Sequence, residues 1–164
     1  MKQFSMDICF KNQLVKYEAN VSFIELMIGI QNNIYKVNGK FLANKQDIDE
    51  FVKALILNYP LPVFYVIRDK DGKLEILNNM KEIMCLYFYY IGKAFPSRYL
   101  DFEEIVDTAD SLLPIKTFIT LDDTYDITYA NLGDVKRLID RQLIKIIELK
   151  TNTEADINKI RQMF

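Results

Sequence analysis

The chain has 164 residues, half of them apolar and 27% charged, a composition typical of one soluble globular domain. It contains no histidine, which excludes a Ser-His-Asp or Cys-His catalytic site, an imidazole general base and a His-bearing zinc site. Its formal net charge of −2 gives no global positive field that would attract nucleic acid or an acidic membrane. We therefore expect a single domain with few of the usual catalytic groups.

Two features of the chain bear on its location. The N-terminus has no apolar stretch long enough for a signal peptide, and no stretch approaches the roughly 18 uncharged apolar residues of a membrane-spanning helix. Cys9 and Cys85 lie in apolar surroundings without a C-x-x-C pair, which predicts buried, reduced thiols. These features predict a cytoplasmic protein without membrane association.

The first elements are a turn, a helix and a short strand. Residues 1–20 are expected to be an N-terminal extension or a hairpin around residues 11–12. Ser22 and Glu25 form an S-x-x-E capping box, which predicts a helix that ends at about residue 31. A short strand is expected over residues 34–37, and the Asn-Gly pair at 38–39 marks a turn.

The central segment predicts a helix, a hairpin and a buried helix. An amphipathic helix follows Asn44 and ends before the two prolines at 60 and 62. Residues 63–67 are β-branched or aromatic, and the turn at 69–72 with a return over 73–77 predicts a hairpin. Residues 83–91 are apolar almost all round, which predicts a central helix that is buried on most sides.

The second half of the chain has weaker patterns. Helices are expected over residues 102–113, 132–141 and 154–164, and strands over residues 115–121 and 143–149. Helices and strands alternate irregularly and include a hairpin, which favours an α+β fold over a doubly wound sheet. We predict one domain over residues 1–164, with a small mixed sheet and a buried central helix.

Motifs for nucleotide or metal chemistry are not found. Five scattered glycines form neither a G-x-x-x-x-G-K-[ST] nor a G-x-G-x-x-G loop. Asp122, Asp123 and Asp126 form the densest acidic cluster, but they lack the glycine and the distal glutamate of an EF-hand loop. A solvated turn is the favoured interpretation, so we predict no metal site and no cofactor.

One basic grouping and one aromatic grouping are candidate binding surfaces. The basic grouping consists of Lys136, Arg137, Arg141 and Lys145. Nearby Asp134 and Asp140 dilute its charge, so nucleic-acid binding there is the less favoured interpretation. The tyrosines at 87, 89 and 90 could stack on bases, but their position in the most apolar helix favours core packing.

Several segments follow one another in an order that points to a known family. Residues 34–46 precede the amphipathic helix, Leu-Asn-Tyr-Pro-Leu-Pro ends it at 57–62, and residues 76–83 follow the hairpin. This order resembles the N-terminal domain of GmrSD-type restriction endonucleases, and residues 126–132, 144–149 and 157–164 resemble its last segments. The resemblance spans about residues 21–164 and implies a ParB/sulfiredoxin-like fold and a setting in bacterial defence or phage counter-defence.

The catalytic motif of that family is altered in this chain. The family motif Asp-Gly-Gln-Gln-Arg is linked to nucleotide-dependent DNA cleavage or to the sensing of modified DNA. The corresponding residues here are Asn78, Asn79, Met80, Lys81 and Glu82. The carboxylate has become an amide, the glycine has gained a side chain, and the arginine that would hold phosphate has become an acid. The upstream arginine and tryptophan of the family fall on Gly39 and Ala43, and its histidine-dependent HNH nuclease module cannot be present.

These losses predict a binding module in place of an enzyme. We expect a catalytically inactive ParB-like domain with a protein-binding or regulatory role, acting on a protein partner, on an active relative or in a homo-oligomer. The alternative is a nucleotide- or DNA-binding protein with residual NTPase or nuclease activity. The candidate binding residues are Lys40, Asn78, Asn79, Lys81 and Glu82, with the basic grouping as a secondary surface.

Overall fold

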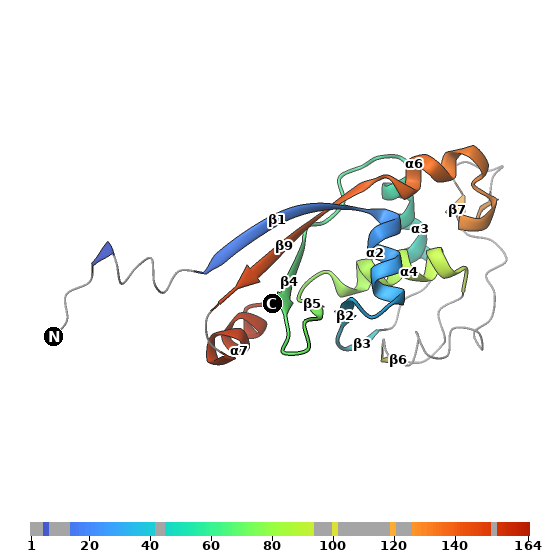
Figure 1. The fold of residues 1–164 in the computed structure, drawn as a ribbon. Helices are drawn as coiled ribbons and strands as arrows, with labels where there is room; N and C mark the ends of the chain where they lie inside the picture. The colour runs from blue at the N-terminus through green and yellow to red at the C-terminus, as the bar shows by residue number, and fades with distance from the viewer. Residues whose placement is uncertain are drawn as a thin grey trace.

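The structure is a computed structural model that describes residues 5–6, 14–41, 45–93, 100–101, 119–120, 126–151 and 154–164. It has an α+β architecture built on a five-stranded mixed sheet of order β1-β9-β4-β5-β2 (Figure 1). The predicted α+β class and small mixed sheet are therefore confirmed. Figure 1 shows β1 and β9 side by side as a long ribbon at the border of the sheet, with α2, α3 and α4 grouped together.

Strands that are distant in sequence pair in this sheet. The five strands are β1 (Val15–Ser22), β2 (Tyr35–Val37), β4 (Phe64–Arg68), β5 (Leu74–Ile76) and β9 (Leu143–Lys150). β1 is antiparallel to β9, and β5 is antiparallel to β4, as the predicted hairpin requires. β4 is parallel to β9, and β2 is parallel to β5. Residues 15–20, expected to belong to an extension or a hairpin, lie in an edge strand paired with β9.

Short elements complete the described strands. β3 (Lys40–Phe41) pairs antiparallel with β6 (Leu100–Asp101), and β7 (Ile119–Thr120) pairs antiparallel with β8 (Asp126–Ile127). The proposed hairpin turn at residues 11–12, the helix at 102–113, most of the strand at 115–121, and Asp122 and Asp123 lie outside the described residues. None of the helices described is long and apolar enough to cross a membrane.

The main helices follow the sequence signals closely. They are α2 (Phe23–Gln31), α3 (Lys45–Ile56), α4 (Met80–Ile91), α6 (Lys136–Asp140) and α7 (Glu154–Gln162), with 3-10 turns η2 (Tyr129–Asn131) and η3 (Gly133–Val135). The Ser22 hydroxyl accepts a hydrogen bond from the Glu25 amide at 3.2 Å, which confirms the predicted start of α2. The helix predicted over residues 132–141 is shorter than expected, because Gly133 adopts φ +61° and interrupts the right-handed helical path.

Side chains of β9 alternate between two apolar cores on opposite faces of the sheet. Ile144 and Ile146 belong to the larger core, which also contains the buried sides of α2, α3 and α4. Ile147 and Leu149 belong to a smaller core, to which α7 contributes Ile160. Residues 83–89 of α4 are all buried, which confirms the predicted central helix. α7 therefore packs on the face of the sheet opposite to the other main helices.

Candidate functional site

The altered motif lies in the turn between β5 and α4, and its first two residues contact the start of β4. Asn78 Oδ1 accepts a hydrogen bond from the Tyr65 amide at 2.8 Å, and Asn78 Nδ2 donates to the Val63 carbonyl at 3.1 Å. Asn79 Nδ2 donates to the same carbonyl at 3.2 Å. The two side-chain amides thus bind backbone groups at the beginning of β4, beyond the end of its pairing with β5. These contacts give Asn78 and Asn79 a structural role.

The backbone of this turn has an unusual conformation at one residue. Asn79 is the N-cap of α4 and adopts φ +51° and ψ +37°, in the left-handed region. Glycine reaches this region without steric cost, and asparagine is among the few other residues that enter it readily. Asn79 therefore keeps a backbone geometry that glycine would adopt and adds a side-chain contact that glycine cannot make.

The charged motif residues lie in the first turn of α4. Lys81 Nζ forms an ion pair with Asp47 Oδ2 of α3 at 3.1 Å. The hydrogen bond from Lys81 to Asp47 raises the pKa of the lysine above its usual value, so Lys81 remains protonated at neutral pH. Glu82 follows it as the acidic residue of that first turn, where a carboxylate interacts favourably with the helix dipole. An incoming phosphate would meet this negative charge.

The central residue of the motif and the upstream candidate lysine have other surroundings. Met80 is partly buried and packs against the larger core. The backbone of Lys40 lies in β3, which pairs with β6 apart from the main sheet. Of the five candidate binding residues, Asn78, Asn79, Lys81 and Glu82 lie together at the β5–α4 turn, because they are neighbours in the sequence.

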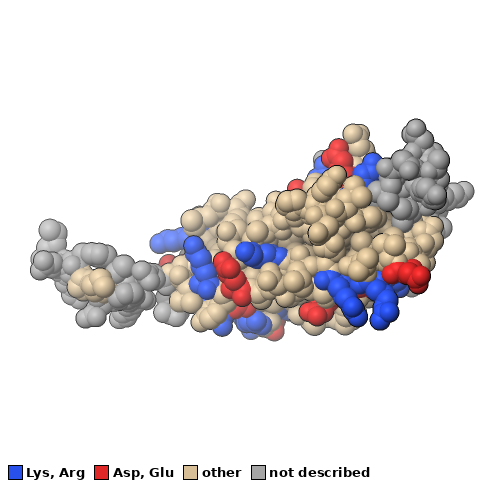
Figure 2. Space-filling model, turned by 90° about the horizontal axis from the view of Figure 1, so that it is seen from above, with Lys and Arg blue, Asp and Glu red and all other residues tan. Residues whose placement is uncertain are grey.

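The basic grouping is spread over α6 and β9. Lys136 Nζ lies 4.8 Å from the ring centroid of Tyr129, in a cation–π contact, and Lys145 Nζ lies 4.0 Å from Glu18 Oε2. Arg137 belongs to α6, and Arg141 is its C-cap residue. On the face shown in Figure 2, lysine and arginine side chains lie in small groups together with aspartate and glutamate. The described residues on this face therefore form no continuous positive track for a phosphate backbone.

Two of the candidate stacking tyrosines and one of the two cysteines are part of the larger core. Tyr87 and Tyr89 are 1% and 0% exposed, which confirms core packing over a stacking platform for these two residues. Cys85 is a buried free thiol, as predicted, and burial raises its pKa to about 12. It is therefore protonated and unreactive at neutral pH. Cys9 lies outside the described residues.

One polar site was not found from the sequence. Glu75 in β5 is only 5% exposed and accepts hydrogen bonds from Arg161 Nε of α7 at 2.7 Å and from Asn38 Nδ2 at 2.5 Å. A polar pocket of about 260 Å³ lies next to this pair. The sequence contains one signal for this site: a glutamate between Leu74 and Ile76 in a predicted strand. A buried carboxylate at this position requires a partner of opposite charge. The partner is 86 residues away in sequence, so the pattern could not identify it.

The described residues contain no group of three or more cysteine, aspartate or glutamate side chains arranged to hold a metal ion. A scan against protein-family models, a search of curated proteins and a search of solved structures each find no match to this chain.

Proposed function

We propose that this chain is a catalytically silent ParB-like domain that functions by binding protein, and that the edge strand β1 pairs with the same strand of a second copy. One observation supports the loss of catalysis: the side chains at the first four motif positions are engaged in contacts that hold the fold together. Asn78 binds the Tyr65 amide in β4, Asn79 binds the Val63 carbonyl just before β4, and Lys81 is paired with Asp47. A role in bacterial defence or phage counter-defence follows from the same resemblance.

The local geometry of the motif supports the ParB-like part of the proposal. The order of α3, β4, β5 and α4 follows the order of segments on which the resemblance rests. The residue that stands in place of the motif glycine is Asn79, whose φ of +51° is a conformation that favours glycine. The turn thus keeps the backbone conformation of the motif but lacks its acid and its arginine. We expect this combination in a domain that has lost its catalytic residues and kept its fold.

The binding part of the proposal rests on the free edge of β1. β1 has β9 on one side and no other strand of the described chain on its opposite side. The Phe23 amide donates to the Gln142 carbonyl at 2.7 Å, in register with the β1–β9 ladder. Because bonded pairs alternate in an antiparallel ladder, the backbone groups of Lys16, Glu18 and Asn20 point away from β9. An unpaired edge of this kind is a template for another strand.

The charge pattern of β1 matches an antiparallel copy of itself. When two β1 strands pair about Tyr17, Lys16 of each copy lies opposite Glu18 of the other. The outward backbone groups of these residues then form the interstrand hydrogen bonds. In each of the two Lys16–Glu18 pairs, the opposite charges attract each other. Sliding one strand by two residues would place Glu18 opposite Glu18, which is repulsive. The charges therefore favour a symmetric, isologous pairing in one register.

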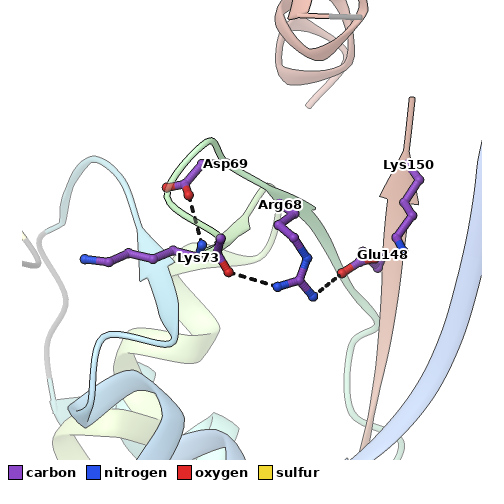
Figure 3. A network of polar contacts seen from close by, with 6 residues as sticks. Arg68, Asp69, Lys73, Glu148 and Lys150 are labelled. Carbon is purple, nitrogen blue, oxygen red and sulfur yellow. Dashed lines mark hydrogen bonds and ion pairs between the residues drawn. The ribbon is translucent and has the colours of Figure 1, made fainter. Parts of the chain in front are cut away.

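Apolar side chains on one face of β1 would be covered by this pairing. Val15 and Tyr17 are 46% and 52% exposed, and in the symmetric register the two Tyr17 side chains are direct neighbours. Lys150 Nζ lies 4.6 Å from the Tyr17 ring centroid and 3.5 Å from Glu148 Oε2. Figure 3 shows Lys150 and Glu148 on the same strand, beside β1. These contacts order Tyr17 before a partner arrives, which lowers the entropy cost of association.

A Lys16→Glu variant should raise the dimer dissociation constant about 10- to 100-fold, because two attractive cross-strand pairs become two repulsive ones. Sedimentation equilibrium over a range of protein concentrations measures this constant. Lys73→Glu is the matched control, since Lys73 is an exposed lysine at the β4–β5 turn, away from β1. An unmodified chain that stays monomeric throughout, or equal association of the Lys16→Glu variant, would contradict the proposed pairing.

A further inference from the structure

The polar pocket lies on the sheet face that carries α7, between β2, the β4–β5 turn and α7. Its lining includes Lys36 of β2, Lys70 of the turn and Arg161 of α7. With a volume of about 260 Å³, it is slightly smaller than the pockets that take drug-sized ligands. It contains none of the altered motif residues and no residue of β1, so its role is independent of the function proposed above.

Arg161 is held in place before any ligand arrives. Its Nε donates to Glu75 Oε2 at 2.7 Å, and its Nη1 donates to Asn158 Oδ1 at 3.2 Å. The Nη2 group makes no hydrogen bond to the described part of the chain, and the Arg161 side chain is 39% exposed. A guanidinium fixed through one edge by a buried carboxylate presents its remaining N–H groups in a defined direction. This arrangement is suited to hold an oxyanion.

Two lysines add positive charge to the same pocket. In the parallel register of β2 and β5, Lys36 lies beside Glu75, which places both side chains on the face of α7. Lys70 approaches from the β4–β5 turn. Neither lysine forms an ion pair with a residue that the structure describes. The two ammonium groups therefore lie beside an oriented guanidinium without a direct ion pair of their own, and Asp69 and Asp71 line the same pocket.

The turn that carries Lys70 is fixed by its own hydrogen bonds. Asp69 Oδ1 accepts from the amides of Asp71 and Lys73, both at 2.9 Å. Arg68 Nη1 donates to the Gly72 carbonyl at 2.9 Å, and Arg68 Nη2 donates to Glu148 at 2.8 Å (Figure 3). The turn is thus attached to β9 as well as to its own hairpin. This wall of the pocket needs little rearrangement to accept a ligand.

We propose that this pocket binds the phosphoryl group of a small phosphorylated molecule. A phosphate matches a guanidinium and two ammonium groups in both charge and hydrogen-bonding capacity. Asp69 and Asp71 also line the pocket, and one carboxylate oxygen of Asp69 is already used by the turn amides. Their negative charge limits the site to a single phosphoryl group and disfavours a chain of phosphates.

Isothermal titration calorimetry of the full chain with inorganic phosphate, adenosine monophosphate and adenosine tests the site. The two phosphates should bind and adenosine should not. Lys36→Gln and Arg161→Lys should each weaken binding about tenfold, because each removes a charge-assisted contact. Lys36 makes no ion pair in the described chain, so its substitution leaves the fold intact, and circular dichroism checks this for both variants.

Lys159→Gln is the matched control for these variants, since Lys159 lies on α7 and does not line the pocket. It should bind phosphate as the unmodified chain does. Absence of heat with both phosphates would overturn the proposal. Equal affinity of the Lys36→Gln, Arg161→Lys and unmodified chains would also overturn it, because the phosphate would then bind elsewhere.

Discussion

An Arg161→Met variant should lose about 2–4 kcal/mol of unfolding free energy at neutral pH, because it removes the cation from a buried carboxylate. Glu75 is 5% exposed and would retain only its contact with Asn38. Methionine keeps most of the apolar volume of the arginine stem, so the loss reports on charge and hydrogen bonding. Urea unfolding at one fixed protein concentration measures the difference.

A second substitution separates the cost of the unpaired charge from the loss of packing. Adding Glu75→Leu to Arg161→Met should restore most of the lost stability, because an apolar pair of similar volume is tolerated where a lone buried charge is not. Glu75 lies between Leu74 and Ile76, and leucine fits this strand environment. A double variant that is no more stable than Arg161→Met would show that the buried charge was not the cause.

An Asn78→Ala variant should lose about 2–3 kcal/mol of unfolding free energy, because the Tyr65 amide is left without its acceptor and the Val63 carbonyl loses one donor. Asn79 Nδ2 would still reach the Val63 carbonyl, which limits the loss. Asn78→Asp should also destabilise, since a carboxylate oxygen would then face that carbonyl. Denaturant unfolding of both variants measures the effect.

The matched control for Asn78 is Asn32→Ala. Asn32 is an exposed asparagine at the C-terminal end of α2, and its cap contacts are made by its backbone amide. We expect its substitution to change the unfolding free energy by less than about 0.5 kcal/mol. If Asn78→Ala and Asn78→Asp were as mild as this control, the motif asparagines would not be structural.

Local sequence signals predicted most of the central elements, because each had a local physical cause. The N-cap serine Ser22 started α2, the prolines after residue 58 ended the helix before β4, and the Asp-Gly turn closed the β4–β5 hairpin. The apolar run after residue 82 became the buried helix α4. For these elements, local conformational preference and tertiary packing agree, so each segment contains enough information to predict its own secondary structure.

Long-range pairing could not be predicted in the same way. β1 contacts β9, whose paired residues follow it by more than a hundred positions, and the alternation of β1 contains no information about that partner. The sequence alone therefore favours an extension or a hairpin for these residues. The same limit applies to the site: Glu75 and Arg161 meet only because α7 packs on the sheet. Neither residue belongs to the motif on which the family resemblance rests.

The proposed pairing of the β1 edge with a second copy of the chain is tested most directly by a mixing experiment. The Lys16→Glu variant has glutamate at both positions 16 and 18, and the Glu18→Lys variant has lysine at both. Like charges then lie opposite each other in a homodimer, so each variant alone should sediment as a monomer. Mixed in equal amounts, they should form a heterodimer, because every cross-strand pair then joins an acid to a lysine. A mixture that stays monomeric while the unmodified chain dimerises, or variants that dimerise separately, would contradict the account.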